Sequence, residues 1–190
     1  MWALVEDNNI TRIFRRPQGF TLNDTQYSQD IFAKWSASDL EDLGLYPVQS
    51  DETNLKNNRY YDNGLESFTF ADNVVTQSWA AATAKPLDDV LWADGDDLLP
   101  GDDFIGTVKV NGLKPLFKAK INFTAGQLLK DTDWMVIREA DGGTAVPSNV
   151  ATYRAAIRTK ANEHTTAIDG VSDVDALAAL EYDWPTLGSW

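Results

Sequence analysis

The sequence lacks cysteine altogether and contains a single histidine, His164. Without cysteine there are no disulfide bonds, thiol nucleophiles or cysteine-based zinc sites, and one histidine excludes multi-histidine metal sites. No apolar run approaches the roughly 18–20 residues that a membrane-spanning helix needs, and the first sixteen residues do not resemble a secretory signal. We therefore expect no contact with membranes, and a chain made in a cytoplasm and used there or packed into a particle assembled there.

Positive charge is also scarce, with 16 lysines and arginines against 29 aspartates and glutamates and a net charge of −13. Phosphate contacts need clustered basic side chains, so this balance argues against nucleic-acid partners. The hydrophobic content of 43% is ample for a packed core. The seven tryptophans suit both cores and protein interfaces.

The N-terminal residues predict a β-hairpin in which Trp2–Val5 and Ile10–Phe14 form strands around a turn at Asp7–Asn9. We expect this hairpin to add to or dock on another subunit, and the remainder to stay folded when residues 1–16 are removed. The only basic cluster, at the end of the hairpin, is either a solvated strand end or a contact with an acidic neighbouring subunit. It consists of Arg12, Arg15 and Arg16.

A helix start follows in the first half of the chain. Ser36 and Asp39 are spaced as a capping box, in which each side chain binds the backbone N–H of the other residue. Trp35 can pack on Leu40 beside this box, and Gly44 is a typical helix stop. The pattern predicts one helix of about two turns.

Two further strands are predicted after this helix. Asn63-Gly64 lies between aromatic-rich runs, and this dipeptide is the strongest short hairpin signal. Residues 65–70 and Val74–Trp79 are the expected strands. Residues 1–85 are therefore predicted to be an antiparallel β-rich unit with one short helix.

Residues 86–112 are predicted to be an acidic linker with a strand at Phe104–Val110. Asp94-x-Asp96 resembles the start of an EF-hand calcium loop, but the twelfth position is Ile105 where the loop needs glutamate. A solvated acidic loop is the preferred interpretation, and a loose cation site is the alternative. The linker contains seven aspartates, at positions 88, 89, 94, 96, 97, 102 and 103.

No motif in the sequence indicates catalysis. Asp88 and Asp89 are paired carboxylates of the kind that glycoside hydrolases use, but nothing around them suggests a substrate cleft. Nucleophile-elbow, Walker and dinucleotide-binding motifs are absent. We expect His164 to be a packed or half-exposed helix residue. We therefore expect that the chain has no catalytic residues and binds no cofactor or metal.

Residues 113–190 are predicted to form a helical hairpin and a short third helix. The first helix has an apolar face of Phe117, Ile121, Thr124 and Leu128. We expect Asp131–Asp133 to form a tight link after this helix, and Trp134–Ile137 to be an extended, buried segment with Trp134 as a core anchor. A turn at Asp141–Gly143 follows.

The second helix is predicted over residues 149–168, with Ser148 as its N-cap and Gly170 just past its end. Its apolar face contains Val150, Tyr153, Ile157, Ala161 and Ile168. Arg154 and Arg158 lie mostly off this face. They are expected to pair with Asp131, Asp133 or Glu139, or to bind a partner. The last helix is expected after a capping box of Ser172 and Asp175, with Val174 and Leu177 inward. The predicted fold class is α+β.

The motif L-L-x-x-T-D-W, a short link and then Y-R-x-x-I-R carries a resemblance to a known family. It consists of Leu128-Leu129, Thr132-Asp133-Trp134, Tyr153-Arg154 and Ile157-Arg158. Residues 113–185 resemble tail-associated proteins of tailed bacteriophages, which include tail-fibre assembly proteins and products found with fibre or baseplate genes. The resemblance implies a virion tail location after assembly in the host cytoplasm. It also implies partners among other tail proteins and homo-oligomers.

Three functions are weighed on this basis. The favoured one is a non-enzymatic structural subunit of a tail fibre, fibre adaptor or baseplate. The second is a tail-fibre assembly chaperone that leaves before the virion is complete, and the third is an accessory enzyme acting on surface sugars. The structural function predicts side chains that only a neighbour covers, and the interface residues expected are Trp2, Arg12, Arg15, Arg16, Arg154, Arg158, Trp184 and Trp190.

Overall fold

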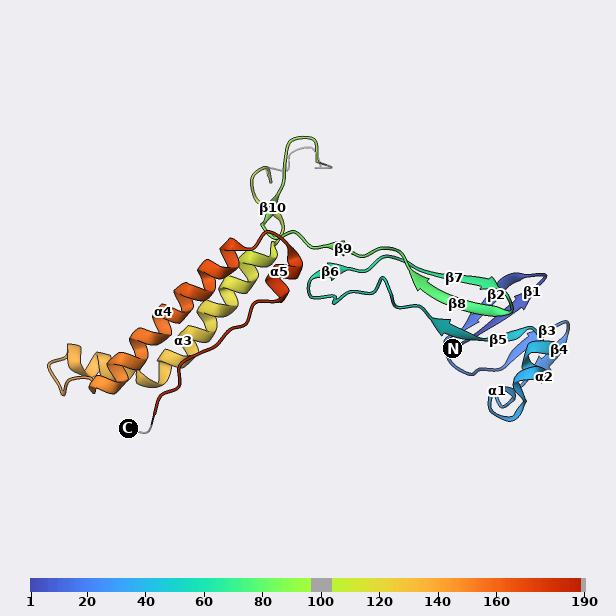
Figure 1. Cartoon of the computed structure of the whole chain (residues 1–190), viewed down its shortest axis with the longest axis horizontal. Helices are drawn as coiled ribbons and strands as arrows, with labels where there is room; N and C mark the ends of the chain where they lie inside the picture. Colours follow the sequence, from blue (N-terminus) through green and yellow to red (C-terminus); the bar gives the residue numbers. More distant parts are fainter. Residues whose placement is uncertain (97–103, 189–190) are drawn as a thin grey trace. The chain divides into compact units, whose positions relative to one another are not determined.

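The computed structural model describes residues 1–96 and 104–188 (Figure 1). The chain divides into two compact units, Met1–Thr83 and Ala84–Trp190. The α+β fold class is confirmed, because strands dominate the first unit and two long helices with a short third one dominate the second. Each unit is described by itself below.

The first unit is built on a five-stranded sheet with the order β2-β1-β5-β8-β7. The pairs are antiparallel except for β5 and β8, which run parallel. Smaller two-stranded pairs are formed by β3 with β4 and by β6 with β9. The elements are β1 (Trp2–Glu6), β2 (Asn9–Phe14), β3 (Phe20–Leu22), β4 (Thr25–Tyr27), α1 (Ile31–Lys34), α2 (Ala37–Asp42), β5 (Leu45–Ser50), β6 (Tyr61–Asp62), β7 (Glu66–Ala71), β8 (Val74–Trp79) and β9 (Thr83–Ala84).

Short polar turns set the two hairpins of the sheet. Asp7-Asn8 connects β1 to β2, and Asp72-Asn73 connects β7 to β8, in both cases with positive φ at both residues. Aspartate and asparagine tolerate this left-handed conformation, which matches the twist of antiparallel strands. The N-terminal hairpin prediction is therefore confirmed.

The hairpin predicted at Asn63-Gly64 is wrong. The Asn63 side chain accepts a hydrogen bond from the Lys56 N–H at 2.8 Å and donates one to the Lys56 carbonyl at 2.9 Å, so it closes a longer loop. Gly64 lies so close to Ala80 that an added Cβ would be 2.6 Å from the Ala80 carbonyl oxygen. Asn63 is thus needed for its side-chain hydrogen bonds, and Gly64 is needed because the chain passes close to the Ala80 backbone.

The capping box before α2 is confirmed. Ser36 accepts a hydrogen bond from the Asp39 N–H, and the Asp39 carboxylate accepts one from the Ser36 N–H, each at 3.2 Å. Gly44 has a φ of 82°, and a Cβ there would lie 2.5 Å from the Val5 carbonyl oxygen. The fold adds a second short helix, α1, where the sequence predicted only one.

Both faces of β1 are buried in the first unit. Leu4 belongs to a cluster with Phe14 and Leu45 that the α1–α2 region covers, and Ala3 and Val5 belong to a second cluster with Val75 on the other face. β1 also has a paired strand on each side. This position argues against the prediction that residues 1–16 can be removed without unfolding the remainder, because they supply an interior strand of the sheet.

The second unit consists of a small hairpin and three helices. Figure 1 shows α3 and α4 lying side by side in opposite directions. Of the strand predicted at Phe104–Val110, only Val108–Val110 is a strand. It pairs with β10, so part of the predicted linker is a β-hairpin. Residues 97–103, with three of the linker aspartates, lie outside the described residues. The elements are β10 (Val90–Leu91), β11 (Val108–Val110), α3 (Leu113–Ala140), α4 (Ser148–Gly170) and α5 (Val174–Ala178).

Some predicted helix boundaries are corrected by one or two residues. Ser148 is already helical and Pro147 precedes α4. Asp173 rather than Ser172 caps α5, because its carboxylate accepts a hydrogen bond from the Ala176 N–H at 2.7 Å. Val174 and Leu177 are buried, as predicted.

Candidate interaction surface on the helical hairpin

The seam between α3 and α4 is apolar along most of its length. The predicted inward positions Phe117 and Ile121 are buried on α3, and Val150, Ile157, Ala161 and Ile168 are buried on α4. α3 continues the same spacing through Ala125, Thr132 and Met135. The seam therefore packs two long helices side by side.

The link and the extended segment predicted at Asp131–Ile137 are wrong, because α3 runs without interruption to Ala140. Asp141 follows the helix, and Gly142 has a φ of 83°, as a turn at this place requires. Trp134 is not a core anchor. Its side chain lies on the outside of the helix, with the Arg138 guanidinium 4.9 Å from the ring centroid.

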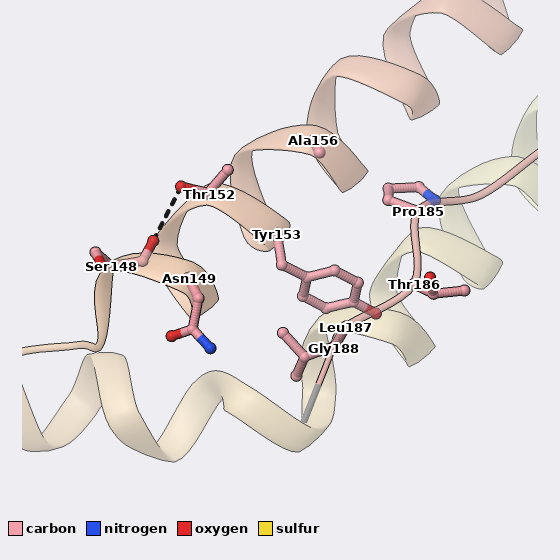
Figure 2. Close-up of a pocket in the computed structure, with 9 residues that line it drawn as sticks. All are labelled: Ser148, Asn149, Thr152, Tyr153, Ala156, Pro185, Thr186, Leu187 and Gly188. Carbon is pink, nitrogen blue, oxygen red and sulfur yellow. Dashed lines mark hydrogen bonds between the residues drawn. The ribbon is translucent and has the colours of Figure 1, made fainter. Parts of the chain in front are cut away.

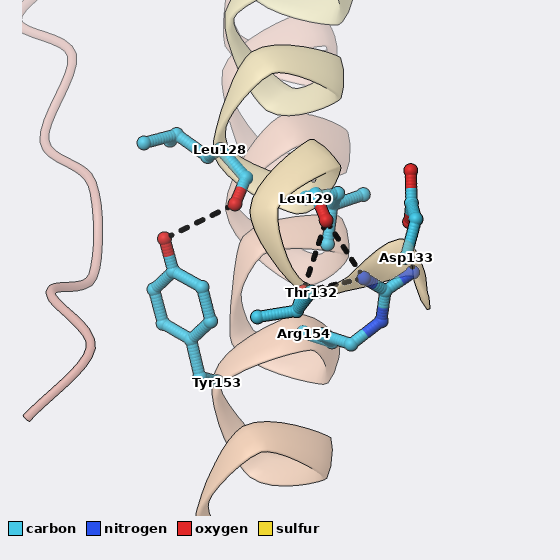
Figure 3. A network of polar contacts seen from close by, with 6 residues as sticks. All are labelled: Leu128, Leu129, Thr132, Asp133, Tyr153 and Arg154. Carbon is cyan, nitrogen blue, oxygen red and sulfur yellow. Dashed lines mark hydrogen bonds and ion pairs between the residues drawn. The ribbon is translucent and has the colours of Figure 1, made fainter. Parts of the chain in front are cut away.

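A buried arginine joins the two helices (Figure 3). Arg154 is only 6% exposed. One of its terminal nitrogens donates hydrogen bonds to the Leu129 carbonyl at 2.8 Å and to the Thr132 hydroxyl at 2.6 Å, and the other binds the Asp133 carboxylate at 2.8 Å. The predicted pairing with Asp133 is confirmed, whereas the predicted position off the apolar face is wrong.

Arg158, one turn further along α4, is exposed. The guanidinium group of Arg154 binds three acceptors of α3 at once. The compact ammonium group of a lysine cannot make the same three contacts. Arg154 is therefore a structural residue, and Arg158 is the member of the predicted pair that remains available at the surface.

The C-terminal segment, residues 179–188, packs along α4 and borders an open groove of about 560 Å³ (Figure 2). The ring of Tyr153 projects toward this segment, and its hydroxyl donates a long hydrogen bond of 3.4 Å to the Leu128 carbonyl. The groove is lined by Ser148, Asn149, Thr152, Tyr153, Ala156, Pro185, Thr186, Leu187 and Gly188.

His164 anchors the C-terminal segment. Its Nε2 lies 2.8 Å from the Asp183 carbonyl oxygen, and its ring packs edge-on against Tyr182 and Trp184, each with centroids 5.2 Å apart. Lys160 adds an ion pair with the Asp183 carboxylate at 3.0 Å. The single histidine is thus a packed helix residue, which is one of the two predicted alternatives.

The ion pair makes docking of the C-terminal segment sensitive to extreme pH. Hydrogen bonding to Lys160 holds the pKa of Asp183 below its ordinary 3.8, and the carboxylates of Asp183 and Glu163 raise the pKa of Lys160 above its ordinary 10.5. Because the pKa of Asp183 is lowered in the docked state, its carboxylate stabilises that state above pH 3.8. This contribution is lost as the pH falls through the lowered pKa. The raised lysine pKa stabilises the docked state below pH 10.5, and that contribution is lost as the pH rises further.

We expect the Trp184 indole N–H signal to shift toward that of an undocked segment when the pH falls below about 4, measured by two-dimensional NMR. Asp183→Asn should already show part of that shift at pH 6 and should lose the step below pH 4. An identical acid titration in wild type and Asp183→Asn would contradict this assignment.

Four large apolar side chains form a line on the outer face of α3, here called the outer stripe. They are Leu116, Phe123, Trp134 and Ile137, which are 52%, 67%, 50% and 61% exposed. Their separations of 7, 11 and 3 residues are close to whole helical turns, so they share one face. Lys120 and Lys130 lie beside the stripe. Sequence reasoning missed this surface because it assigned Trp134–Ile137 to an extended segment.

The three arginines of the predicted basic cluster have different surroundings in the structure. The Arg12 guanidinium stacks 4.8 Å from the Phe14 ring centroid, and Arg15 forms an ion pair with Glu66. Arg16 is exposed. Two of the three arginines therefore contact their own unit, and a contact with an acidic neighbour stays a prediction for Arg16.

The terminal tryptophans are also partly used within the fold. Trp2 is half-buried, with its ring centroid 5.7 Å from that of Phe32, and Trp184 is half-buried against His164. Trp190 lies outside the described residues. Trp2 and Trp184 thus expose less apolar surface than the outer stripe does.

Two of the aspartates considered as chemical groups, Asp89 and Asp96, bind backbone N–H groups of their own unit. Asp89 accepts a hydrogen bond from the Gly112 N–H at 2.7 Å, next to the start of α3. The Ala93 N–H and the Lys109 ammonium hold the pKa of Asp96 below its ordinary value. Within residues 1–96 and 104–188, no three histidine, aspartate or glutamate side chains are grouped so that they could hold a metal ion.

No protein-family model, curated protein or solved structure matches the chain. Among the helices in the described parts, none is both long and apolar enough to cross a membrane.

Proposed function

We propose that the chain is a non-enzymatic structural subunit of a bacteriophage tail, in a fibre, a fibre adaptor or the baseplate, and acts through protein–protein contacts. The outer stripe of α3 carries this proposal. It presents four apolar side chains, each at least half exposed, on one face of a long helix. Exposed apolar surface of this kind marks binding sites, and aromatic side chains supply much of the energy of protein interfaces.

The motif of the family resemblance supports the same surface. Thr132, Asp133 and Arg154 hold α3 against α4 (Figure 3). Trp134 and Arg158 belong to the same motif but lie exposed outside this network. A tryptophan that the fold does not bury is well explained if a partner buries it, as a lasting place in the virion tail would require.

The alternative is a tail-fibre assembly chaperone, favoured by the net charge of −13, which suits a soluble carrier that releases its client. It would use the same stripe for transient binding. Loss of the gene would then leave the fibre insoluble, and finished particles would lack the chain.

The double substitution Phe123→Glu with Trp134→Glu tests the structural proposal. Both side chains are at least half exposed, so the hairpin should fold, whereas burial of two carboxylates in an interface should reduce incorporation into particles at least about 30-fold. Incorporation is measured by mass spectrometry against the major tail protein. The matched control is Thr159→Glu with Thr166→Glu, two exposed positions on α4, which should be incorporated normally. Normal incorporation of the stripe variant would refute the proposal.

A further inference from the structure

Charge is distributed along α3 with a clear polarity. Residues 113–130 contain four lysines and no acidic residue, namely Lys114, Lys118, Lys120 and Lys130. Residues 131–140 contain Asp131, Asp133 and Glu139 against the single Arg138. The helix dipole prefers the opposite arrangement, with acids near the N-terminus and bases near the C-terminus.

Contacts within the unit account for part of this polarity. Lys114 and Lys118 reach the C-terminal end of α4, where they bind the carbonyl and the carboxylate of Asp169. Asp133 binds Arg154. Lys120, Lys130 and Asp131 are exposed on α3, so the fold of the unit gives no comparable reason for their placement.

We propose that the outer stripe pairs with the outer stripe of a second copy of the chain, antiparallel about a two-fold axis near Gly126 and Gln127. This inference rests on the proposed function, because it names the partner of the same surface. In an antiparallel pair, the basic half of each α3 lies against the acidic half of the other α3, so the pair contains two such contacts. A parallel arrangement would instead place lysine on lysine and aspartate on aspartate, which is unfavourable.

The side chains of the stripe are self-complementary about this axis. Residues equally far from the midpoint oppose each other, so Leu116 opposes Ile137 of the other copy, about 16 Å from the axis at a rise of 1.5 Å per residue. The exposed Ala119 opposes the bulky Trp134, which leaves room for the indole. By the same rule Phe123 opposes Lys130, a pairing that permits an ammonium to lie over a ring.

The charged flank follows the same symmetry. Lys120 and Asp131 share one side of the stripe, at positions almost equally distant from the axis. In the antiparallel pair, Lys120 of each copy therefore comes within reach of Asp131 of the other. Such flanking pairs set the orientation of paired helices more than their affinity.

Gly126 lies at the centre of the arrangement. It is in the interior of a 28-residue helix, where glycine costs about 1 kcal/mol relative to alanine. No atom lies within 4 Å of a Cβ built at this position, so packing inside the unit does not require glycine. Close approach of a second helix at the axis gives a reason for the absent side chain.

Cysteine cross-linking tests the geometry in the full chain, which has no native cysteine. Gln127→Cys should form a disulfide-linked dimer on oxidation, because each copy of this residue lies near the axis. Leu116→Cys alone should not cross-link, whereas a mixture of Leu116→Cys with Ile137→Cys should give the mixed dimer. Self-linking of Leu116→Cys, or no cross-linked dimer from any of these variants, would overturn the proposal.

Charge reversal tests the orientation without any cross-link. Lys120→Glu and Asp131→Lys should each weaken dimerisation about tenfold in sedimentation equilibrium, and the double variant should recover it. Thr159→Glu, an exposed change on α4, is the matched control and should dimerise as wild type does. A wild-type chain that stays monomeric, or a double variant that is as weak as the single ones, would refute the antiparallel pair.

Failure of this inference is distinguishable from failure of the proposed function. If the chain is monomeric but the stripe variant is still lost from particles, the second copy is the wrong partner and another tail protein covers the stripe. If the chain dimerises as described but is absent from particles, the dimer stands and the structural tail function falls.

Discussion

Arg154→Met is expected to lower the free energy of unfolding of the helical hairpin by about 3 kcal/mol. Methionine keeps much of the apolar stem of arginine but none of its donors. The Leu129 carbonyl and the Thr132 hydroxyl would lose their hydrogen bonds from Arg154, and α3 would lose its charged link to α4 through Asp133.

Hydrogen exchange read by mass spectrometry measures this effect in the full chain. Protection of α3 and α4 amides should fall by about 150-fold, the factor that corresponds to 3 kcal/mol. Arg158→Met removes an exposed arginine one turn away and should change protection by less than about threefold, since such surface substitutions change stability by less than about 0.5 kcal/mol. Equal losses in the two variants would show that Arg154 does not act as a buried link.

Phe14→Ala is expected to destabilise the first unit by about 4 kcal/mol. The ring is fully buried, and its centroid lies 5.0 Å from that of Phe20 and 5.6 Å from that of Phe32. Removing it leaves a cavity between the sheet and the helices that cover it. The contacts of Phe14 with these two rings are lost with it.

Calorimetric unfolding of the full chain reports this change. The transition of the first unit should move to lower temperature, while that of the second unit stays in place. Leu65→Ala is the control, because this side chain of the first unit is 86% exposed and its removal should leave both transitions within about 3 °C. A Phe14→Ala protein with unchanged transitions would mean that this cluster is not the core of the unit.

Local signals in the sequence predicted the structure well where one short segment decides the conformation. Ser36 and Asp39 form the expected capping box because the motif needs only four consecutive residues. Asp7-Asn8 makes the expected turn because both residues tolerate positive φ. The periodic apolar face predicted α4 because the seam follows the helical repeat.

Long-range contacts explain what could not be predicted. The parallel pairing of β5 with β8 and the pairing of β6 with β9 join strands that are far apart in the sequence, so no turn signal marks them. The aspartates at 131 and 133 favoured a link, but Arg154 of α4 and solvent satisfy them within a continuous helix. That error also hid the outer stripe.

The candidate surface was thus only partly accessible from the sequence. The sequence left Asp131, Asp133 and Glu139 open as partners of Arg154, and the pairing with Asp133 and the burial of Arg154 depend on how α4 meets α3. Extending the helical periodicity from Leu116 through Phe123 to Ile137 would have placed these residues on one outer face. The extended interpretation of Trp134–Ile137 prevented that step.

Quantitative mass spectrometry of particles purified from cells that encode the chain tests the central claim most directly. Stoichiometric presence, with a fixed copy number relative to the major tail protein, is the result that a structural tail subunit predicts. Absence from particles, with the chain abundant in the same lysate, would contradict a lasting place in the tail.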